Sequence, residues 1–413
     1  MFQEIKQCRI CGNDELVPLL NIGTQFLTGV FPRNRNQKIT SGPLELVRCA
    51  GDRSKTCGLV QLKHSFDAAE MYGENYGYRS GLNNSMVKHL HQKVRSISDI
   101  INFQKGDLII DIGSNDSTLL QGYGAQDCLL VGIDPTADKF KQYYPPHIKF
   151  IADFFSKKVV NDHFGNKKAT IVTSLAMFYD LESPIDFAQQ IYDILADDGI
   201  WILEQSYLSA MIAKNAYDTI CHEHLEYYSL RQIKWITDRV GFKIIDLEEN
   251  DVNGGSLAIT VAKSTSAYDE NHKKISKLLN SEKELDKNET YEIFKYAVFN
   301  HREKLIDFIH KTNAEKKLIL GYGASTKGNV ILQFCNLTTE NIPYVAEINE
   351  DKFGSFTPGT FIPIISEKEA KAMKPDFFMV LPWHFRENIV HKEKDYLRSG
   401  GKLLFPLPLI EVI

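Results

Sequence analysis

Four short apolar runs recur between residues 105 and 262, and each is long enough for a buried strand but short for a buried helix. Helix-length segments separate these runs. Strands that alternate with helices in this way form βαβ units, which place the strands side by side in a parallel sheet. The pattern predicts an α/β fold with strands at residues 108–112, 129–133, 169–173 and 200–203.

The length of the chain and its later pattern indicate three domains. A chain of 413 residues is too long for one ordinary hydrophobic core. We expect a first domain over residues 1–65, a second over 66–264 and a third over 265–413. The third domain shows a second α/β pattern, with apolar runs at residues 317–324, 344–346, 377–381 and 402–406.

Two helical segments should connect these domains. Met86, Leu90, Val94 and Ile97 recur at spacings of three to four residues, which predicts a helix that leads into the second domain. Charged residues dominate residues 265–312, which predicts a solvated helical connector rather than a functional site.

Charge and hydropathy exclude several kinds of partner. The net charge is -5 without any polybasic block, so we expect neither nucleic acid nor an anionic membrane to bind. No uninterrupted apolar stretch reaches the ~18 residues of a transmembrane helix. Residues 1–6 lack the apolar run of a signal peptide. We therefore expect a cytoplasmic protein that acts as a monomer.

Four of the seven cysteines lie within the first 57 residues. Cys8 and Cys11 form a tight pair, and Cys49 and Cys57 form a wider one. Four thiolates satisfy the tetrahedral preference of Zn²⁺ and leave no open coordination position, so the metal should be structural. A segment this small buries little apolar surface and gains stability from a metal. The alternative is that these thiols are ordinary buried side chains.

The first predicted strand of the second domain carries Asp111 and runs into a turn that contains Gly113, Ser114 and Asn115. Asp134 follows the second strand. Glycine lets a ligand approach the backbone, and an acidic side chain after the second strand can accept both hydroxyl groups of a ribose. These residues therefore predict a nucleoside-binding site.

Asp153 and Phe154 follow the next strand position. The aspartate can bond an exocyclic amine while the phenylalanine packs on a purine face. The turn lacks the G-x-G-x-x-G pattern, which argues against a nicotinamide dinucleotide. The order of these groups predicts S-adenosylmethionine as the cofactor, and the alternative is an ordinary α/β turn.

Two histidines flank a glutamate after the fourth predicted strand, in the sequence His222-Glu223-His224. Histidines two positions apart diverge on a helix, so this is not the zinc site of an H-E-x-x-H motif. An imidazole suits general-base catalysis near neutral pH, and ligands bind at the carboxyl edge of such a sheet. We expect a general base here, and the alternative is a pair of polar histidines at a domain seam.

Taken together, these residues resemble the S-adenosylmethionine-dependent sugar C-3′-methyltransferases of deoxysugar biosynthesis. The resemblance covers essentially the whole chain. It includes the four cysteines, the turn at residues 111–116 and the Glu223-His224 pair. It also includes segments at residues 74–80, 253–256, 321–329 and 357–363.

The resemblance implies a class I methyltransferase Rossmann-like domain, followed by a second Rossmann-like domain that contributes to nucleotide-sugar binding. The implied reaction is methylation at C-3 of a 4-keto-6-deoxysugar linked to dTDP, GDP or CDP. His224 matches the position that looks like the family's base. Tyr76 and Tyr78 match tyrosines that line the sugar site, and Lys327 is expected near the diphosphate.

The resemblance also implies supporting roles for neighbouring residues. Tyr76, Tyr78 and His222 are candidate donors to the enolate oxygen, and Glu223 belongs to the catalytic group. Further substrate contacts are expected from Arg79, Ser80, Asn253 and Tyr322.

Two positions depart from the family pattern and leave the identity of the sugar open. Cys221 stands where some members have an active-site tyrosine, and Arg79 stands where a histidine can occur.

Three other functions compete with this interpretation. The chain could methylate oxygen or nitrogen of another small molecule, or it could be a zinc-containing binding protein without catalysis. An NAD-dependent sugar epimerase is disfavoured, because the glycine fingerprint and a suitable Tyr-x-x-x-Lys pair are missing.

Overall fold

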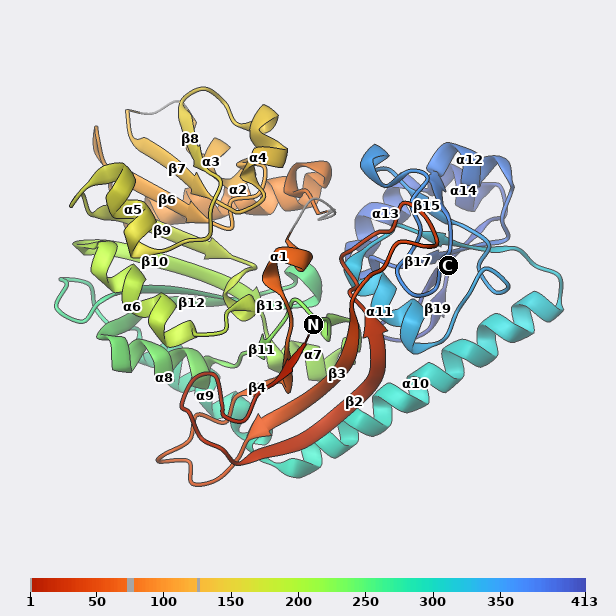
Figure 1. Ribbon diagram of the computed structural model, residues 1–413, viewed down its shortest axis with the longest axis horizontal. Coiled ribbons are helices and arrows are strands. Elements are labelled where there is room, and N and C mark those ends of the chain that lie inside the picture. The colour runs from red at the N-terminus through yellow and green to blue at the C-terminus, as the bar shows by residue number, and fades with distance from the viewer. Residues whose placement is uncertain (1, 73–77, 125–126) are drawn as a thin grey trace.

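A seven-stranded sheet forms the centre of the computed structural model, which describes residues 2–72, 78–124 and 127–413 (Figure 1). The strand order is β12-β13-β10-β9-β6-β7-β8. The bounds of these strands are β6 Leu108–Ile112, β7 Leu129–Ile133, β8 Ile148–Ile151, β9 Ala169–Leu175, β10 Leu195–Ser206, β12 Phe242–Asn250 and β13 Ser256–Lys263.

The strands from β8 to β10 run parallel, as the alternating pattern predicts. All five residues of β6 are buried, which is typical of a strand covered on both faces. β13, which the sequence pattern did not identify as a strand, is antiparallel to both β10 and β12. Only the short turn around Val252–Gly254 joins β12 to β13, and so short a connection cannot carry a parallel crossover.

Helices cover both faces of this sheet. The predicted leading helix is confirmed as α2 (Asn84–Ile100), and its apolar positions 86, 90, 94 and 97 are buried. Asn83 caps it by accepting a hydrogen bond from the Ser85 amide. The other helices of this part are α1 Ala68–Met71, α3 Thr118–Gln121, α4 Ala137–Phe140, α5 Lys157–Phe164, α6 Pro184–Ile194, α7 Leu208–Ala213 and α8 Leu230–Val240.

A smaller antiparallel sheet near the N-terminus has the order β11-β4-β3-β2. Its edge strand β11 (Glu226–Tyr227) comes from the middle of the chain, far from the others in sequence. A two-stranded pair, β1 with β5, lies beside it. The remaining bounds are β1 Gln3–Glu4, β2 Leu16–Phe26, β3 Ser41–Cys49, β4 Val60–Leu62 and β5 His64–Ser65.

A third sheet of six strands, in the order β16-β15-β14-β17-β18-β19, closes the chain. It is parallel except for β19. The predicted connector is confirmed as helical, with α9 (His272–Ser281) and the long α10 (Asn288–Ala314). The other bounds are β14 Ile319–Tyr322, β15 Val345–Glu347, β16 Ile364–Ser366, β17 Phe377–Val380, β18 Lys402–Phe405, β19 Glu411–Val412, α11 Thr326–Phe334, α12 Glu367–Ala372, α13 Arg386–Lys392 and α14 Lys394–Arg398.

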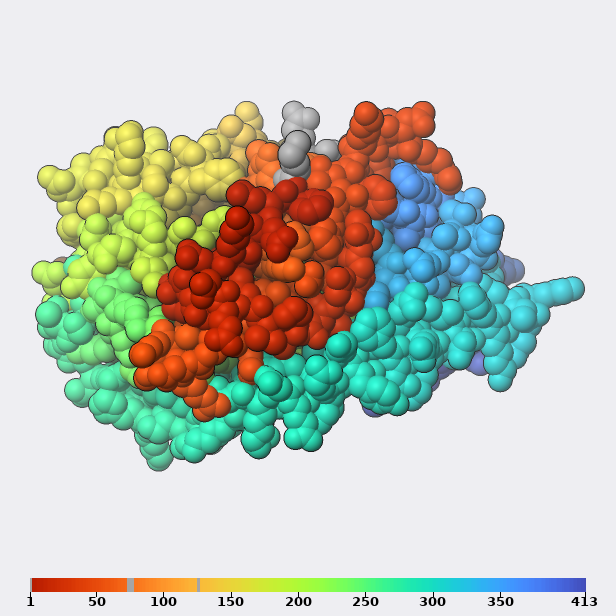
Figure 2. Space-filling model, turned by 60° about the horizontal axis from the view of Figure 1, so that its bottom comes forward, coloured from red at the N-terminus to blue at the C-terminus, as the bar shows by residue number. Residues whose placement is uncertain are grey.

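The N-terminal sheet lies across the seam between the two larger sheets (Figures 1 and 2). Gln333 of α11 exchanges two hydrogen bonds with the backbone of Phe26, and Asn329 donates to the carbonyl of Thr28 at 2.7 Å. Apolar side chains of β2, β3 and β4 pack into the same core as α10 and the C-terminal sheet. The three parts therefore bury one another, which confirms the α/β fold class with its N-terminal module and two further domains.

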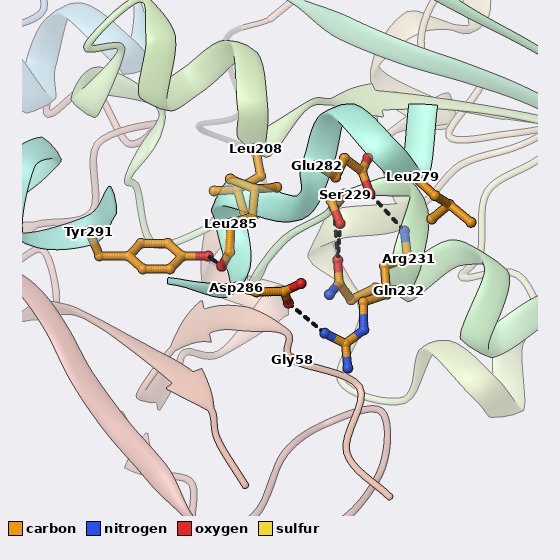
Figure 3. Close-up of a pocket in the computed structure, with 10 residues that line it drawn as sticks. All are labelled: Gly58, Leu208, Ser229, Arg231, Gln232, Leu279, Glu282, Leu285, Asp286 and Tyr291. Atoms are coloured by element: carbon orange, nitrogen blue, oxygen red, sulfur yellow. Dashed lines mark hydrogen bonds and ion pairs between the residues drawn. The ribbon is translucent and has the colours of Figure 1, made fainter. Parts of the chain in front are cut away.

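The buried carboxylate of Glu282 fastens the connector to the central domain (Figure 3). It accepts hydrogen bonds from the Tyr207 hydroxyl at 2.9 Å and from the backbone amides of Leu230 and Arg231 at 2.7 and 3.2 Å. These amides begin helix α8, where a negative charge is favoured by the helix dipole.

Replacement of Glu282 by alanine should lower the free energy of unfolding by about 2–4 kcal/mol, because three buried donors lose their acceptor. Urea denaturation followed by circular dichroism measures this change. The matched control is Glu284→Ala, which removes an exposed ion pair with Lys287 and should cost less than about 0.5 kcal/mol. Equal midpoints for the two variants would contradict this role.

Candidate active site

The turn after β6 holds its backbone in an unusual conformation. Gly113, Asn115 and Ser117 have φ angles of 74°, 48° and 64°, in the left-handed region that non-glycine residues rarely adopt. A side chain at Gly113 would also crowd Met177, whose Cγ lies 3.1 Å from the Cβ position. Backbone strain of this kind concentrates at ligand-binding loops.

Polar contacts hold this turn in place. The Asn115 amide donates to the Asp134 carboxylate at 2.8 Å. The Asn115 side chain accepts from the Ser80 amide and donates to the Tyr78 carbonyl. Ser114, also predicted to bind cofactor, shares a 2.9 Å hydrogen bond with the Tyr144 hydroxyl. The segment that begins at Tyr78 therefore crosses the predicted cofactor turn.

The predicted cofactor residues line one edge of the central sheet. Because β6, β7 and β8 are parallel neighbours, the residues after their carboxyl ends share that edge. Asp134 follows β7 and is buried, whereas Asp153 and Phe154 follow β8 and are exposed. Phe154 is 51% exposed, so its ring is free to cover a ligand. Asp111 is buried within β6, accepts from the Thr173 hydroxyl at 2.6 Å, and has a pKa raised to about 7 by burial.

The imidazole of His224 is set up as a neutral base. Its Nδ1 lies 2.9 Å from the Thr219 carbonyl, which can only accept, so Nδ1 carries the hydrogen and Nε2 keeps a lone pair. The Tyr179 ring packs on the imidazole at 4.2 Å between centroids. Burial and the positive charge of Lys327 lower the pKa of His224 to about 3.

Lys327 is the residue of the C-terminal domain whose charge acts on His224. It lies in the first turn of α11, and its Nζ donates to the carbonyl of Asn253 at 2.7 Å. Its charge lowers the pKa values of both His224 and His384. Burial lowers the pKa of Lys327 itself, and the negative charge of Asp218 opposes that fall. Two predicted residues, Lys327 and Asn253, therefore meet at the seam between the domains.

Sequence reasoning missed three residues of this site. His384 follows β17, and its buried Nδ1 has no hydrogen-bond partner among the described residues. Asp218 accepts from the Trp383 indole at 2.7 Å. Asp180 accepts from the Tyr72 hydroxyl at 2.7 Å. Asp180 and His384 both come shortly after predicted strands, so the rule that ligands bind at strand ends could have identified them.

Glu223 lies where all three parts of the chain meet. The hydroxyl of Thr28 donates to its Oε2 at 3.3 Å. A side chain at Gly29 would overlap its Oε1, and that same position faces Thr326 of α11. Burial raises the pKa values of both Glu223 and Asp180, and the charge of Glu223 adds to the rise at Asp180.

Two residues that the sequence assigns to the substrate site contact other protein groups in the structure. The His222 ring is fully buried against Phe66 with its Nε2 toward the Gly42 carbonyl, so it is not available as a donor to substrate. Its pKa falls to about 4 because of this burial. The Tyr322 hydroxyl donates to buried Glu393 inside the C-terminal domain, and its contact with substrate stays a prediction.

The tyrosine-rich segment is described only in part. Tyr76 lies outside the described residues, whereas Tyr78 is 44% exposed. The guanidinium of Arg79 lies 4.2 Å above the Tyr143 ring and 3.8 Å from the Asp116 carboxylate. Arg79 and Ser80 thus border the cofactor turn. Cys221, where the family pattern can have tyrosine, is fully buried.

The four N-terminal cysteines converge as predicted. Their sulfur atoms all lie within 4.8 Å of one another, and two pairs are 3.4 Å apart. Sulfur atoms around a tetrahedral Zn²⁺ are separated by about 3.8 Å, given Zn–S bonds of about 2.3 Å. Asn13 adds an amide donor 3.4 Å from the Cys49 sulfur. The group therefore fits a closed structural zinc site.

Other features of the described chain do not suggest a different ligand. A cavity of about 50 Å³ beside Glu282 is far smaller than an ordinary ligand site, and Arg231 and Asp286 on its wall pair with each other (Figure 3). No helix in the described ranges combines the length and the apolar character that a bilayer crossing requires.

Three family models match successive parts of the chain. They are described as "Putative zinc binding domain" at residues 8–72, "Methyltransferase domain" at residues 86–247 and "C-methyltransferase C-terminal domain" at residues 251–408. The C-methyltransferase NovU of Streptomyces niveus is 26% identical over 415 residues, which cover 99% of this chain and 97% of NovU.

Two solved methyltransferases resemble part of the chain. The plantazolicin methyltransferase BpumL in complex with SAH is 11% identical, with coverage of 43% of this chain and 84% of BpumL and a TM-score of 0.35. The N-methyltransferase NodS from Bradyrhizobium japonicum WM9 is 12% identical, with coverage of 44% and 98% and a TM-score of 0.32.

The cysteine cluster predicts one zinc ion per chain. Replacement of Cys57 by serine should abolish stoichiometric zinc and lower the midpoint of thermal unfolding, because the metal links the two halves of the cluster. Elemental analysis and calorimetry measure both effects. Cys128→Ser, at a cysteine outside the cluster, should keep its zinc. A Cys57 variant with full zinc content would contradict the assignment.

Proposed function

The chain belongs to the family of S-adenosylmethionine-dependent C-methyltransferases with an N-terminal zinc-binding domain, and from this premise we propose that it methylates C-3 of a nucleotide-linked 4-keto-6-deoxysugar. The observation that carries the proposal is the neutral imidazole of His224, whose Nε2 keeps a lone pair and whose pKa is lowered by burial and by the charge of Lys327. Carbon methylation needs a base, whereas methylation of an oxygen or nitrogen lone pair does not need a C–H bond to break.

In this proposal His224 removes the C-3 proton of the sugar. The neighbouring C-4 ketone acidifies that proton, and the electron pair of the C–H bond becomes the enolate. Nε2 holds the proton while Nδ1–H stays bonded to Thr219. When bound, the cofactor would supply an electrophilic sulfonium methyl group, whose bond to sulfur breaks as the enolate carbon bonds to it and whose electron pair leaves with the neutral thioether. Placement of the two reactants is the main task that remains for the protein.

The charge of Lys327 should make the basicity of His224 depend on whether substrate is bound. In the free protein its charge and the burial of the site hold the pKa of His224 at about 3, which makes the imidazole a weak base. A diphosphate bound near Lys327 would offset that charge and strengthen the base when the sugar is present. This arrangement supports a nucleotide-linked substrate, and dTDP, GDP and CDP all satisfy it.

Hydroxyl and carboxyl groups are the proposed donors to the enolate oxygen. Tyr78 is described and partly exposed, and we retain Tyr76 with it as a proposed donor. Glu223 and Asp180 add two carboxyl groups whose pKa values are raised by burial. Donors fixed by buried neighbours lose little energy to reorganisation during the reaction.

The direct test of the proposal incubates the protein with S-adenosylmethionine and 4-keto-6-deoxysugars linked to dTDP, GDP or CDP. Mass spectrometry should show a gain of one methyl group with one of these sugars. In deuterated solvent without a methyl donor, deuterium should enter at C-3. A methylated product formed without any such exchange would favour transfer to oxygen or nitrogen.

Replacement of His224 by asparagine should lower kcat by about 10²- to 10⁴-fold, because the base is lost. Calorimetry should show cofactor affinity within about twofold of the wild type, since the cofactor turn at residues 113–117 remains. The exposed His147, replaced in the same way, is the matched control. A His224 variant with near-normal C-3 exchange would exclude this histidine as the base.

Removal of the Lys327 charge should make His224 easier to protonate. Burial is the larger cause of the low pKa of His224 and the charge of Lys327 adds to it, so the Lys327→Met variant should raise this pKa above about 3 while burial keeps it below the ordinary value of about 6.5. Titration of the histidine ring carbons by NMR, with His224→Asn to identify the signal, measures this shift. Lys352→Met, in the same domain, should leave the signal unchanged. No upward shift in Lys327→Met would contradict the proposed coupling.

A further inference from the structure

Arg9 lies between Cys8 and Cys11, yet its side chain is turned inward and is only 3% exposed. Its Nη1 donates to the Leu62 carbonyl at 2.6 Å, and its Nη2 donates to the Ser65 hydroxyl at 2.9 Å. An arginine this buried is unusual unless its fork of donors has specific partners. These contacts fix the guanidinium against the strand end at Leu62.

The same guanidinium reaches the two segments that surround His224. Its Nε lies 3.2 Å from Glu182 Oε2 and 4.0 Å from Glu226 Oε1. Glu182 follows the segment of Tyr179 and Asp180, and Glu226 stands two residues after His224. The Glu226 carboxyl is fully buried, and Arg9 is the cation that opposes the rise of its pKa.

Backbone hydrogen bonds join these segments directly beside the base. The Leu225 amide donates to the Tyr179 carbonyl, and the Leu225 carbonyl accepts from the Leu62 amide, both at 2.8 Å. Leu62 is also the residue whose carbonyl binds Arg9. The Tyr179 ring packs on His224. The position of the His224 imidazole thus depends on the neighbouring residue Leu225. The backbone of Leu225 is bonded to Tyr179 on one side and to Leu62 of the N-terminal sheet on the other.

We propose that Arg9 is a positioning residue through which the zinc site aligns His224 with the substrate. The inference rests on the proposed role of His224 as the base. A metal bound by Cys8 and Cys11 fixes the backbone from which Arg9 projects. Arg9 then holds Leu62, Glu182 and Glu226 in one arrangement. Misplacement of a catalytic group by about 1 Å can cost about a hundredfold in rate, so a small loosening here should affect the chemistry.

The experiment compares Arg9→Gln with Arg9→Lys and with Arg53→Gln. Arg53 also belongs to the N-terminal domain, but it pairs with Asp286 at an exposed position away from His224. Arg9→Gln should keep one zinc ion by elemental analysis and a normal affinity for S-adenosylhomocysteine by calorimetry. Deuterium incorporation at sugar C-3 should fall at least about tenfold with KM little changed. Arg9→Lys should recover part of the rate, and Arg53→Gln should match the wild type.

Amide hydrogen exchange followed by mass spectrometry provides a measurement that needs no substrate. Peptides that span residues 219–228 should exchange faster in Arg9→Gln, while peptides from the cofactor turn should not. If His224 proves not to be the base, this result still tests the positioning by itself. Unchanged exchange in residues 219–228 would overturn the proposal, as would an unchanged C-3 exchange rate.

A second variant covers the case in which Arg9→Gln does not fold. Glu182→Gln removes the charge from one partner of Arg9, and its side chain is 52% exposed, so folding should tolerate it. We expect a smaller loss of rate, of about two- to fivefold, and faster amide exchange in residues 219–228. If neither changes in this variant, Arg9 does not act on His224 through Glu182 and the proposal is wrong.

Discussion

The hydrogen bonds of the Leu225 backbone are the constraint on which the arrangement of this protein depends. They join the segment after β9 to β4 of the N-terminal sheet, and they do so one residue beyond His224. The adjoining strand β11 then completes the N-terminal sheet. A residue of the central domain is therefore held by the N-terminal domain at the place where the chemistry is proposed to occur.

The C-terminal domain acts on the same place through charge. Lys327 is half-buried at the seam between the two larger sheets, and its charge adds to the effect of burial in lowering the pKa values of His224 and His384. A buried cation costs free energy unless an anion accompanies it. Asp218 supplies one such anion, since its charge opposes the fall in the pKa of Lys327 that burial causes.

Local patterns predicted much of the fold and the metal site. The buried runs predicted strands β6, β7, β9 and β10, because continuous apolar segments suit strands covered on both faces. The four cysteines predicted the zinc cluster, since tetrahedral coordination needs all of them together. The turn at Gly113 and the acid at Asp134 also lie together as expected, because adjacent parallel strands share one edge.

Features that depend on long-range packing could not be predicted in this way. His222 and His224 look alike in sequence, but one packs on Phe66 and the other faces the seam. The reversed direction of β13 follows from its short connection to β12. Asp180 and His384 follow strand ends and were open to the strand-end rule, whereas Arg9 reaches this region only through its contacts with Leu62 and Glu182, which no local pattern records.

Strand β11 is synthesised long after the other strands of the N-terminal sheet, and this order affects folding on the ribosome. The first sheet lacks one of its edge strands until residues 226 and 227 have left the ribosome, so β4 presents unpaired backbone groups in the meantime. Open strand edges invite pairing with other chains. A fragment that ends near residue 72 would keep its four cysteines but would still expose the edge of β4. The zinc module is therefore part of a larger folding unit and not a domain that can be detached.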